Sequence, residues 1–214
     1  GLTYPDRFAA IVPVCGCVNG ISANYLPNML HVPVYCIGGE KDAKITKVNR
    51  LVRTELEKLK LPWTYVECPG RGHEAFLEEL PKAFAWLDKQ VRPRAPARVD
   101  FVSGDLETCR VFWLMMLAAQ PRKDGTELGA DKLPLAIRSG GLARLTGTVR
   151  PGNLLDIQGR NIRGVRIWLA DELFDRTRPL RVTFNGRVEQ LVAIQPSRRR
   201  LLELAQRLGE REQL

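Results

Sequence analysis

The sequence is poor in the residues that build metal centres, phosphate sites and membrane spans. Its 214 residues include only two histidines, and its cysteines form no Cys-x-x-Cys pair, so the ligand spacing of a zinc site is missing. No Gly-rich phosphate loop occurs either. No apolar run approaches the ~20 residues that a membrane span needs. We therefore expect no metal, no cofactor and no membrane insertion.

The cysteines are more typical of a reduced core than of a disulfide framework. There are five, an odd number. Cys15 and Cys17 are too close in sequence for an ordinary strand disulfide, and Cys36 and Cys68 fall in predicted buried strands. We expect these thiols to be reduced and to pack as small apolar side chains.

The positive charge is spread along the chain rather than concentrated. The net charge is +9, with 13 Lys/Arg against 10 Asp/Glu in residues 1–95 and 20 against 14 in residues 96–214. The only basic block is Arg198–Arg200, and no zinc pattern, aromatic–basic repeat or recognition helix accompanies it. A solvated arginine-rich surface is favoured, and binding to nucleic acid is the less favoured alternative.

The segment from Val32 to His73 predicts a β-α-β unit. Val32–Ile37 is an apolar run typical of a buried parallel strand, and Pro62–Cys68 is again strand-like. Thr46 can cap a helix between them. A crossover helix makes the two strands parallel, which places Asp42 and His73 just beyond their carboxyl ends, where open α/β sheets build their sites. The apolar residues at helical spacing are Val48, Leu51, Val52, Leu56 and Leu59.

Patterns on both sides of this unit complete the expected organisation. Phe8–Val14 is apolar throughout and predicts another buried strand, and Glu74–Gln90 predicts a helix in which Pro81 begins a second piece. Residues 1–91 are thus expected to form one region, residues 92–98 (RPRAPAR) a stiff linker, residues 99–196 a β-sandwich-like domain and residues 197–214 a carboxy-terminal helix.

Short alternating segments with turn residues between them predict the β-sandwich. Asn185-Gly186 is a strong signal for a two-residue hairpin, because both positions of a type I′ turn need a positive φ. Tryptophans 63, 86, 113 and 168 are expected in the core. The predicted strands are Val99–Phe101, Cys109–Leu117, Leu142–Val149, Asn153–Ile157, Val165–Leu169, Leu180–Phe184 and Val188–Ile194.

Five stretches carry a resemblance to a known family. GGEKDAKITKVN and YVECPGRGHEAF resemble the acid and histidine segments of α/β-hydrolases of the secreted prolyl-oligopeptidase and feruloyl-esterase-like type. YPDRFAAIVPVCG resembles the segment after the nucleophile helix in the same group, and the strands VRIWL and LRVTFNG resemble its carboxy-terminal region. The resemblance implies an α/β fold: the C-terminal half of an α/β-hydrolase parallel sheet, followed by a small all-β sandwich-like domain.

The resemblance also implies a catalytic acid and base. It assigns the acid role to Asp42 and the general-base role to His73, with Glu40 as the alternative acid. The family's order is Ser, Asp, His, so the serine is expected before Gly1 and the chain is expected to be a fragment that is inactive alone. The implied substrate is a small-molecule ester or a peptide.

Other readings of the sequence stay open beside this one. No Gly-x-Ser-x-Gly occurs around Ser22, Ser103 or Ser139. Cys15 or Cys17 is conceivable as a thiol nucleophile, as in dienelactone-type hydrolases, although the Gly-x-Cys-x-Gly spacing fails. A second class of function is a non-enzymatic module whose β-sandwich binds carbohydrate or protein. His31 is expected at the surface or at a boundary.

Overall fold

The computed structural model describes residues 1–18, 22–104, 110–119 and 142–192. Within these ranges the chain forms three helical segments and ten strands. None of the described helices is long and apolar enough to cross a membrane. Cys109, Ser139, Arg198–Arg200 and the predicted carboxy-terminal helix lie outside the described residues.

The elements are η1 (Ser22–His31), β1 (Val34–Gly39), α1 (Ala43–Lys58), β2 (Trp63–Cys68), α2 (Leu80–Leu87), β3 (Arg98–Ser103), β4 (Arg110–Val111), β5 (Leu114–Ala119), β6 (Ala143–Arg150), β7 (Leu154–Arg160), β8 (Ile162–Ile167), β9 (Leu180–Phe184) and β10 (Arg187–Val192).

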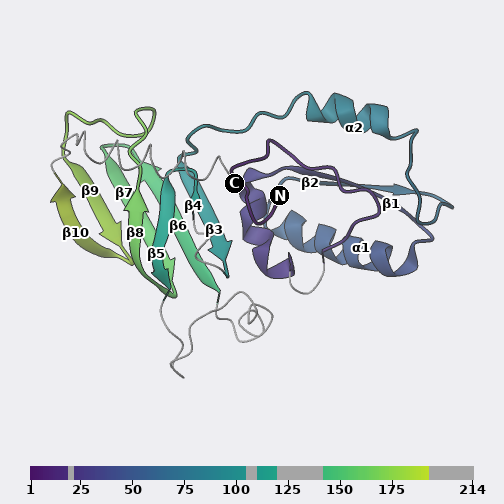
Figure 1. The fold of residues 1–214 in the computed structure, drawn as a ribbon, viewed down its shortest axis with the longest axis horizontal. Coiled ribbons are helices and arrows are strands. Elements are labelled where there is room, and N and C mark those ends of the chain that lie inside the picture. The colour runs from purple at the N-terminus through teal and green to yellow at the C-terminus, as the bar shows by residue number, and fades with distance from the viewer. Residues whose placement is uncertain (19–21, 105–109, 120–141, 193–214) are drawn as a thin grey trace, which may run out of the picture.

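The predicted β-α-β unit is present. β1 and β2 pair in parallel from Val34 opposite Trp63 to Gly39 opposite Cys68, and α1 connects them. All six residues of β1 are buried, because helices cover both faces of this small sheet (Figure 1). Alternate side chains serve the two faces: Tyr35 and Ile37 pack in the cluster that contains α2, while Val34 and Cys36 pack with Leu56 of α1.

The predicted fold class is wrong, because the chain is β-rich and the parallel sheet is not half of an α/β-hydrolase sheet. Among the described residues that sheet has only two strands. The third strand predicted over Phe8–Val14 reduces to two isolated parallel bridges, Ile11 with Val34 and Val14 with Ile37. Pro13 lies between the bridging residues and has no N–H to donate to a ladder. Most of the strands belong to two other sheets.

Two helix predictions also need correction. The helix expected from Glu74 begins only at Leu80, and Pro81 lies in its first turn as predicted. α1 begins at Ala43, so Thr46 lies inside the helix, where its hydroxyl donates to the carbonyl of Gly39. Leu51 and Leu59 of the expected apolar stripe are exposed, and Leu56 is the member that is fully buried.

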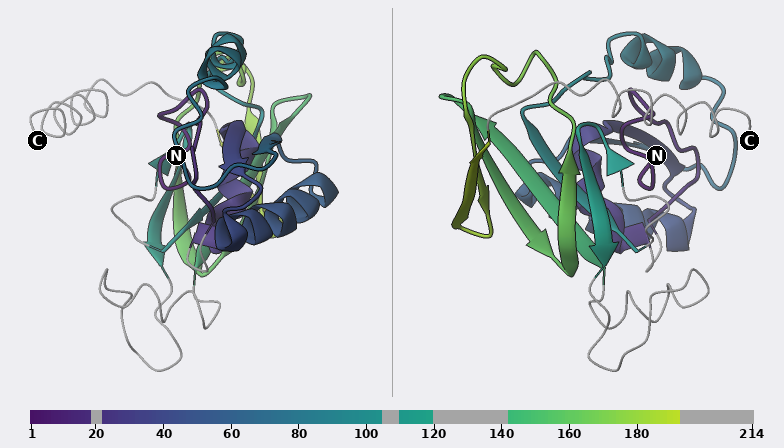
Figure 2. Two further views of the ribbon diagram at one scale, coloured as in Figure 1. Left: turned by 90° about the vertical axis from the view of Figure 1, so that its right-hand side faces the viewer. Right: turned by 60° about the vertical axis from the view of Figure 1, so that its left-hand side comes forward.

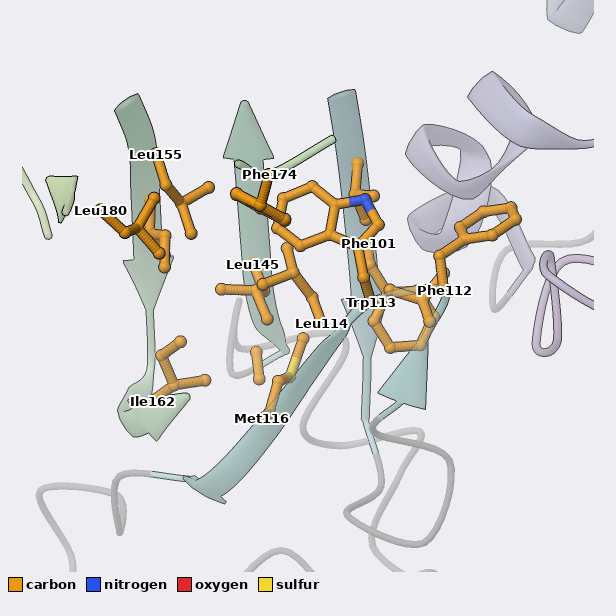
Figure 3. Packing of buried hydrophobic residues seen from close by; sticks show 14 residues of the cluster. Phe101, Phe112, Trp113, Leu114, Met116, Leu145, Leu155, Ile162, Phe174 and Leu180 are labelled. Carbon is orange, nitrogen blue, oxygen red and sulfur yellow. The ribbon is translucent and has the colours of Figure 1, made fainter. Parts of the chain in front are cut away.

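The β-rich region consists of two sheets that share one core. Five strands lie in the order β10-β9-β7-β6-β3 and three in the order β4-β5-β8. Neighbouring pairs are antiparallel except β7 with β9. Figure 3 shows residues from both sheets meeting: Phe101, Leu145 and Leu155 from one, Leu114 and Met116 from the other. Trp113 and Phe174 pack edge to face with ring centroids 5.8 Å apart.

The strand predictions hold in this region, with one instructive difference. Asn185 and Gly186 both have positive φ (49° and 80°), which confirms the predicted hairpin turn. The single strand expected over Cys109–Leu117 is instead the hairpin of β4 and β5. The chain turns at Phe112, whose φ is 48°, and this bulky residue gives no turn signal in the sequence.

The two regions meet where η1 packs on β3, a contact that the further views in Figure 2 also show. Asn28, fully buried, pairs with the backbone of Val102, accepting from its N–H at 2.7 Å and donating to its carbonyl at 3.0 Å. His31 is 6% exposed at this boundary, so of its two expected positions the surface one is wrong. Its Nε2 accepts from the N–H of Asp100, and its ring packs against Phe112.

Candidate acid–base site

Two turns at the carboxyl ends of β1 and β2 are fastened together by their backbones. The N–H of Lys41 donates to the carbonyl of Arg71 at 2.7 Å, and the N–H of Glu40 donates to that of Cys68 at 3.0 Å. Gly39 lies so close to the carbonyls of Arg71 and Gly72 that an added Cβ would collide with them. The turn after β1 therefore needs glycine at this position.

Charged side chains stabilise the second turn. The carboxylate of Glu40 accepts from the N–H of Gly70 at 2.7 Å. Arg71 donates to the carboxylates of Glu74 and Glu78, and the hydrogen bonds from Arg71 lower the pKa of Glu74. All of these side chains are at least partly exposed, so each pair contributes little energy alone. Their combined effect is to hold the loop on which His73 lies.

The fastened turns bring Asp42 and His73 together, as the β-α-β pattern predicts. Asp42 Oδ2 lies 2.8 Å from Nδ1 of His73. The side chain of Asp42 is 14% exposed and that of His73 is 66% exposed. Asp42 also occupies the N-cap position of α1, but its side chain makes no cap hydrogen bond. Glu40, the alternative acid, is engaged with Gly70 instead.

This arrangement can fix the proton on the imidazole. A carboxylate that accepts from Nδ1–H holds the ring in one tautomer and leaves Nε2 free to take a proton. No hydrogen bond to Nε2 is found among the described residues. The buried carboxylate and the exposed ring therefore form a pair that can act as a general base and then as a general acid at the surface.

No described serine side chain accompanies the pair. The chain has four serines, at positions 22, 103, 139 and 197. Of these, only the Ser103 side chain is described, and it is buried in β3 of the five-stranded sheet. The nucleophile of a Ser-Asp-His triad is thus not supplied by the described side chains.

A thiol does lie beside the pair, and sequence reasoning gave it little weight. Cys15 follows the bridge of Val14 with Ile37, has a φ of 50° and donates its backbone N–H to the carbonyl of Ile37. Its sulfur and donor atoms of Asp42 and His73 all lie within 4.8 Å of one another. Cys17, the other thiol considered, is exposed and outside this group. The spacing of 27 and 31 residues between the three gives no local signal.

The thiol of Cys15 is turned toward the backbone. Its sulfur donates to the carbonyl of Glu74 at 3.1 Å, and the residue is only 8% exposed. A nucleophile has to reach substrate, and this sulfur is buried and engaged as a donor. The described geometry therefore favours Cys15 as a neighbour of the acid–base pair over Cys15 as its nucleophile.

Comparisons with protein-family models, with curated proteins and with solved structures find no match to this chain.

Proposed function

We propose that this chain carries the acid and the general base of a serine hydrolase that acts on a small-molecule ester or a peptide. The observation that carries the proposal is the 2.8 Å contact between Asp42 Oδ2 and His73 Nδ1. The carboxylate is mostly buried while the ring is mostly exposed. A structural ion pair at a surface turn does not need this difference in exposure. A general base does need it, because its ring has to be oriented by a carboxylate on the protein side and open to substrate on the other.

In the proposed reaction His73 takes the proton of a serine hydroxyl as the oxygen attacks the carbonyl carbon. The ring then returns that proton to the leaving alcohol or amine, and a water repeats the cycle on the acyl-enzyme. Asp42 stays ionised throughout and stabilises the imidazolium. The serine is the group that the described side chains do not provide.

The test is ester hydrolysis by the complete product of the gene, using an activated ester as substrate. His73→Ala should abolish turnover, and Asp42→Asn should lower kcat by about 10⁴-fold because the ring is left in the wrong tautomer. A fluorophosphonate that labels one serine in the parent should fail to label the His73→Ala protein.

The matched control is Asp88→Asn, which removes another carboxylate of the same region. Asp88 is exposed at the end of α2 and lies outside the site. Its variant should keep the parent kcat. Turnover that survives His73→Ala, or an equal loss in Asp42→Asn and Asp88→Asn, would contradict the proposed roles.

The binding-module alternative has one feature in its favour. A hollow of about 370 Å³ lies between the amino-terminal segment and the β-sandwich, lined in part by Arg110, Trp168 and Asp6. However, the guanidinium of Arg110 stacks 4.5 Å from the ring centre of Trp168, so this face of the indole is not free to stack on a sugar. The acid–base pair is the better supported site.

A further inference from the structure

We propose that Cys15, Asp42 and His73 form a binding site for a divalent transition metal of the zinc class. The three residues come from three neighbouring backbone segments that run in parallel. Cys15 follows the bridge of Val14 with Ile37, Asp42 follows β1, and His73 follows β2. Their donor atoms lie within 4.8 Å of one another. A metal ion placed among them would receive one donor atom from each of the three segments.

The chemistry of the donors selects the metal. Thiolate, imidazole and carboxylate are the three ligand types that Zn²⁺ accepts, at about 2.0–2.3 Å from each donor atom. Mg²⁺ and Ca²⁺ prefer oxygen donors only, so a sulfur and a ring nitrogen argue against them. Tetrahedral zinc needs its donors roughly 3.5 Å apart. The present spacing brackets this value, with Asp42 Oδ2 2.8 Å from His73 Nδ1 and all three donor atoms within 4.8 Å of one another.

The surroundings leave one coordination position open. The His73 ring is 66% exposed, so a water can reach a metal held beside it. Three protein ligands with an open fourth position are the usual arrangement of reactive zinc sites, whereas structural sites are closed by four. The sulfur of Cys15 would exchange its proton, now donated to the carbonyl of Glu74, for the metal.

Of the four described thiols, Cys15 alone belongs to this group. Cys36 is fully buried, and burial raises its pKa to about 12, which keeps it protonated. Cys68 is buried in β2, and burial raises its pKa as well. Cys17 is exposed but lies outside the group. It therefore offers a thiol control that is only two residues away in the sequence.

The consequence of metal binding rests on the proposed function. Asp42 and His73 now share a hydrogen bond, and a metal coordinated by both groups takes the place of that proton. The imidazole is then unable to act as a general base. Metal binding at this site should therefore inhibit the hydrolase, and removal of the metal with a chelator should restore it.

The test is titration of the reduced, metal-free chain with Co²⁺, followed by competition with Zn²⁺. The parent and Cys17→Ser should show a thiolate-to-cobalt charge-transfer band and tetrahedral ligand-field bands that saturate at one equivalent. Cys15→Ser should lose the charge-transfer band. Asp42→Asn and His73→Gln each change a direct ligand, so they should weaken Zn²⁺ binding by more than the roughly 10–100-fold that loss of an outer-shell partner costs. The Asp42 and His73 variants change partly exposed loop residues, so they remain informative if Cys15→Ser folds poorly.

The absorption readout does not depend on hydrolysis. A charge-transfer band that persists in Cys15→Ser, or that disappears in Cys17→Ser, would overturn the metal site. Unchanged Zn²⁺ affinity in both Asp42→Asn and His73→Gln would also overturn it, whatever the ester assay shows. Loss of the charge-transfer band in Cys15→Ser together with no ester hydrolysis by the complete product of the gene would support the metal site and contradict only the proposed hydrolase.

Discussion

The β-sandwich and the region around the β-α-β unit (residues 1–91, here the β-α-β region) differ in how their cores are built. In the sandwich, fourteen buried residues from two sheets and from the segments that connect their strands form a single cluster. In the β-α-β region, the sheet divides the buried residues into separate clusters on its two faces. Seven of the nine large apolar side chains that are exposed among the described residues belong to this region, including Leu51, Leu77 and Phe84. The sandwich therefore has the larger continuous core, and the β-α-β region carries the candidate site.

The junction of the two regions and the site are held by different sets of contacts. η1 packs on β3, and buried polar groups at the junction are paired across it. The turns that hold Asp42 and His73, in contrast, are fastened locally.

The largest expected effect follows from emptying the shared core of the sandwich. Phe101 is 1% exposed in β3, and Phe101→Ala should lower the free energy of unfolding by about 3–5 kcal/mol, because apolar contact is lost and a cavity is left. Urea unfolding followed by tryptophan fluorescence measures the change. Val188→Ala removes a side chain that is 66% exposed and should change the stability by no more than about 0.5 kcal/mol. Equal stability of the two variants would contradict the single-core description.

The junction should give the chain an acid-sensitive stability. Burial lowers the pKa of His31 to about 4, with Arg98 acting in the same direction and Asp100 opposing it. The His31 ring binds a proton near pH 6.5 in the unfolded chain. In the folded chain it binds this proton only near pH 4. Stability from this group is thus complete above pH 6.5 and falls as the pH drops through this window, by on the order of 3 kcal/mol.

Urea unfolding at pH 7 and at pH 4.5 measures this loss. His31→Gln keeps a polar side chain but cannot titrate, so its stability should fall less between the two pH values than that of the parent. Identical losses in parent and variant would mean that His31 is not buried at the junction.

A smaller effect is expected from the amide that joins η1 to β3. Asn28→Ala would leave both the N–H and the carbonyl of Val102 without their present partner, and also the carbonyl of Leu2. Unsatisfied buried groups of this kind cost about 1–3 kcal/mol. Thr54→Ala, which removes an exposed hydroxyl bound within α1, should shift the urea midpoint far less. Equal shifts in the urea midpoint of the two variants would mean that the Asn28 amide does not stabilise the junction.

Local patterns predicted more of this fold than long-range ones. The β-α-β unit and the Asn185-Gly186 hairpin follow from short stretches whose residues dictate their own backbone, and the structure has both. The expected hydrolase half-sheet is absent: the apolar run Phe8–Val14 forms only two isolated bridges with β1, and Pro13 between them has no N–H to donate. The turn at Phe112 depends on tertiary packing, and a bulky residue gives no warning of it.

The candidate site was likewise predictable from local patterns but not where it depends on long-range contacts. Asp42 and His73 could be placed together because each follows a strand of one β-α-β unit. Cys15 could not, because its approach depends on a bridge outside any regular strand. The burial of His31 likewise depends on η1 packing against β3, which is a contact between regions. Neither leaves a periodic trace in the sequence.

The most direct test of the central claim is the protonation state of His73 read by imidazole ¹⁵N–¹H NMR. Neutral His73 should carry its proton on Nδ1, and this proton should resonate downfield because Asp42 accepts it. Asp42→Asn should remove the downfield resonance. A parent whose neutral ring carries its proton on Nε2, or a spectrum that Asp42→Asn leaves unchanged, would contradict the acid–base pair.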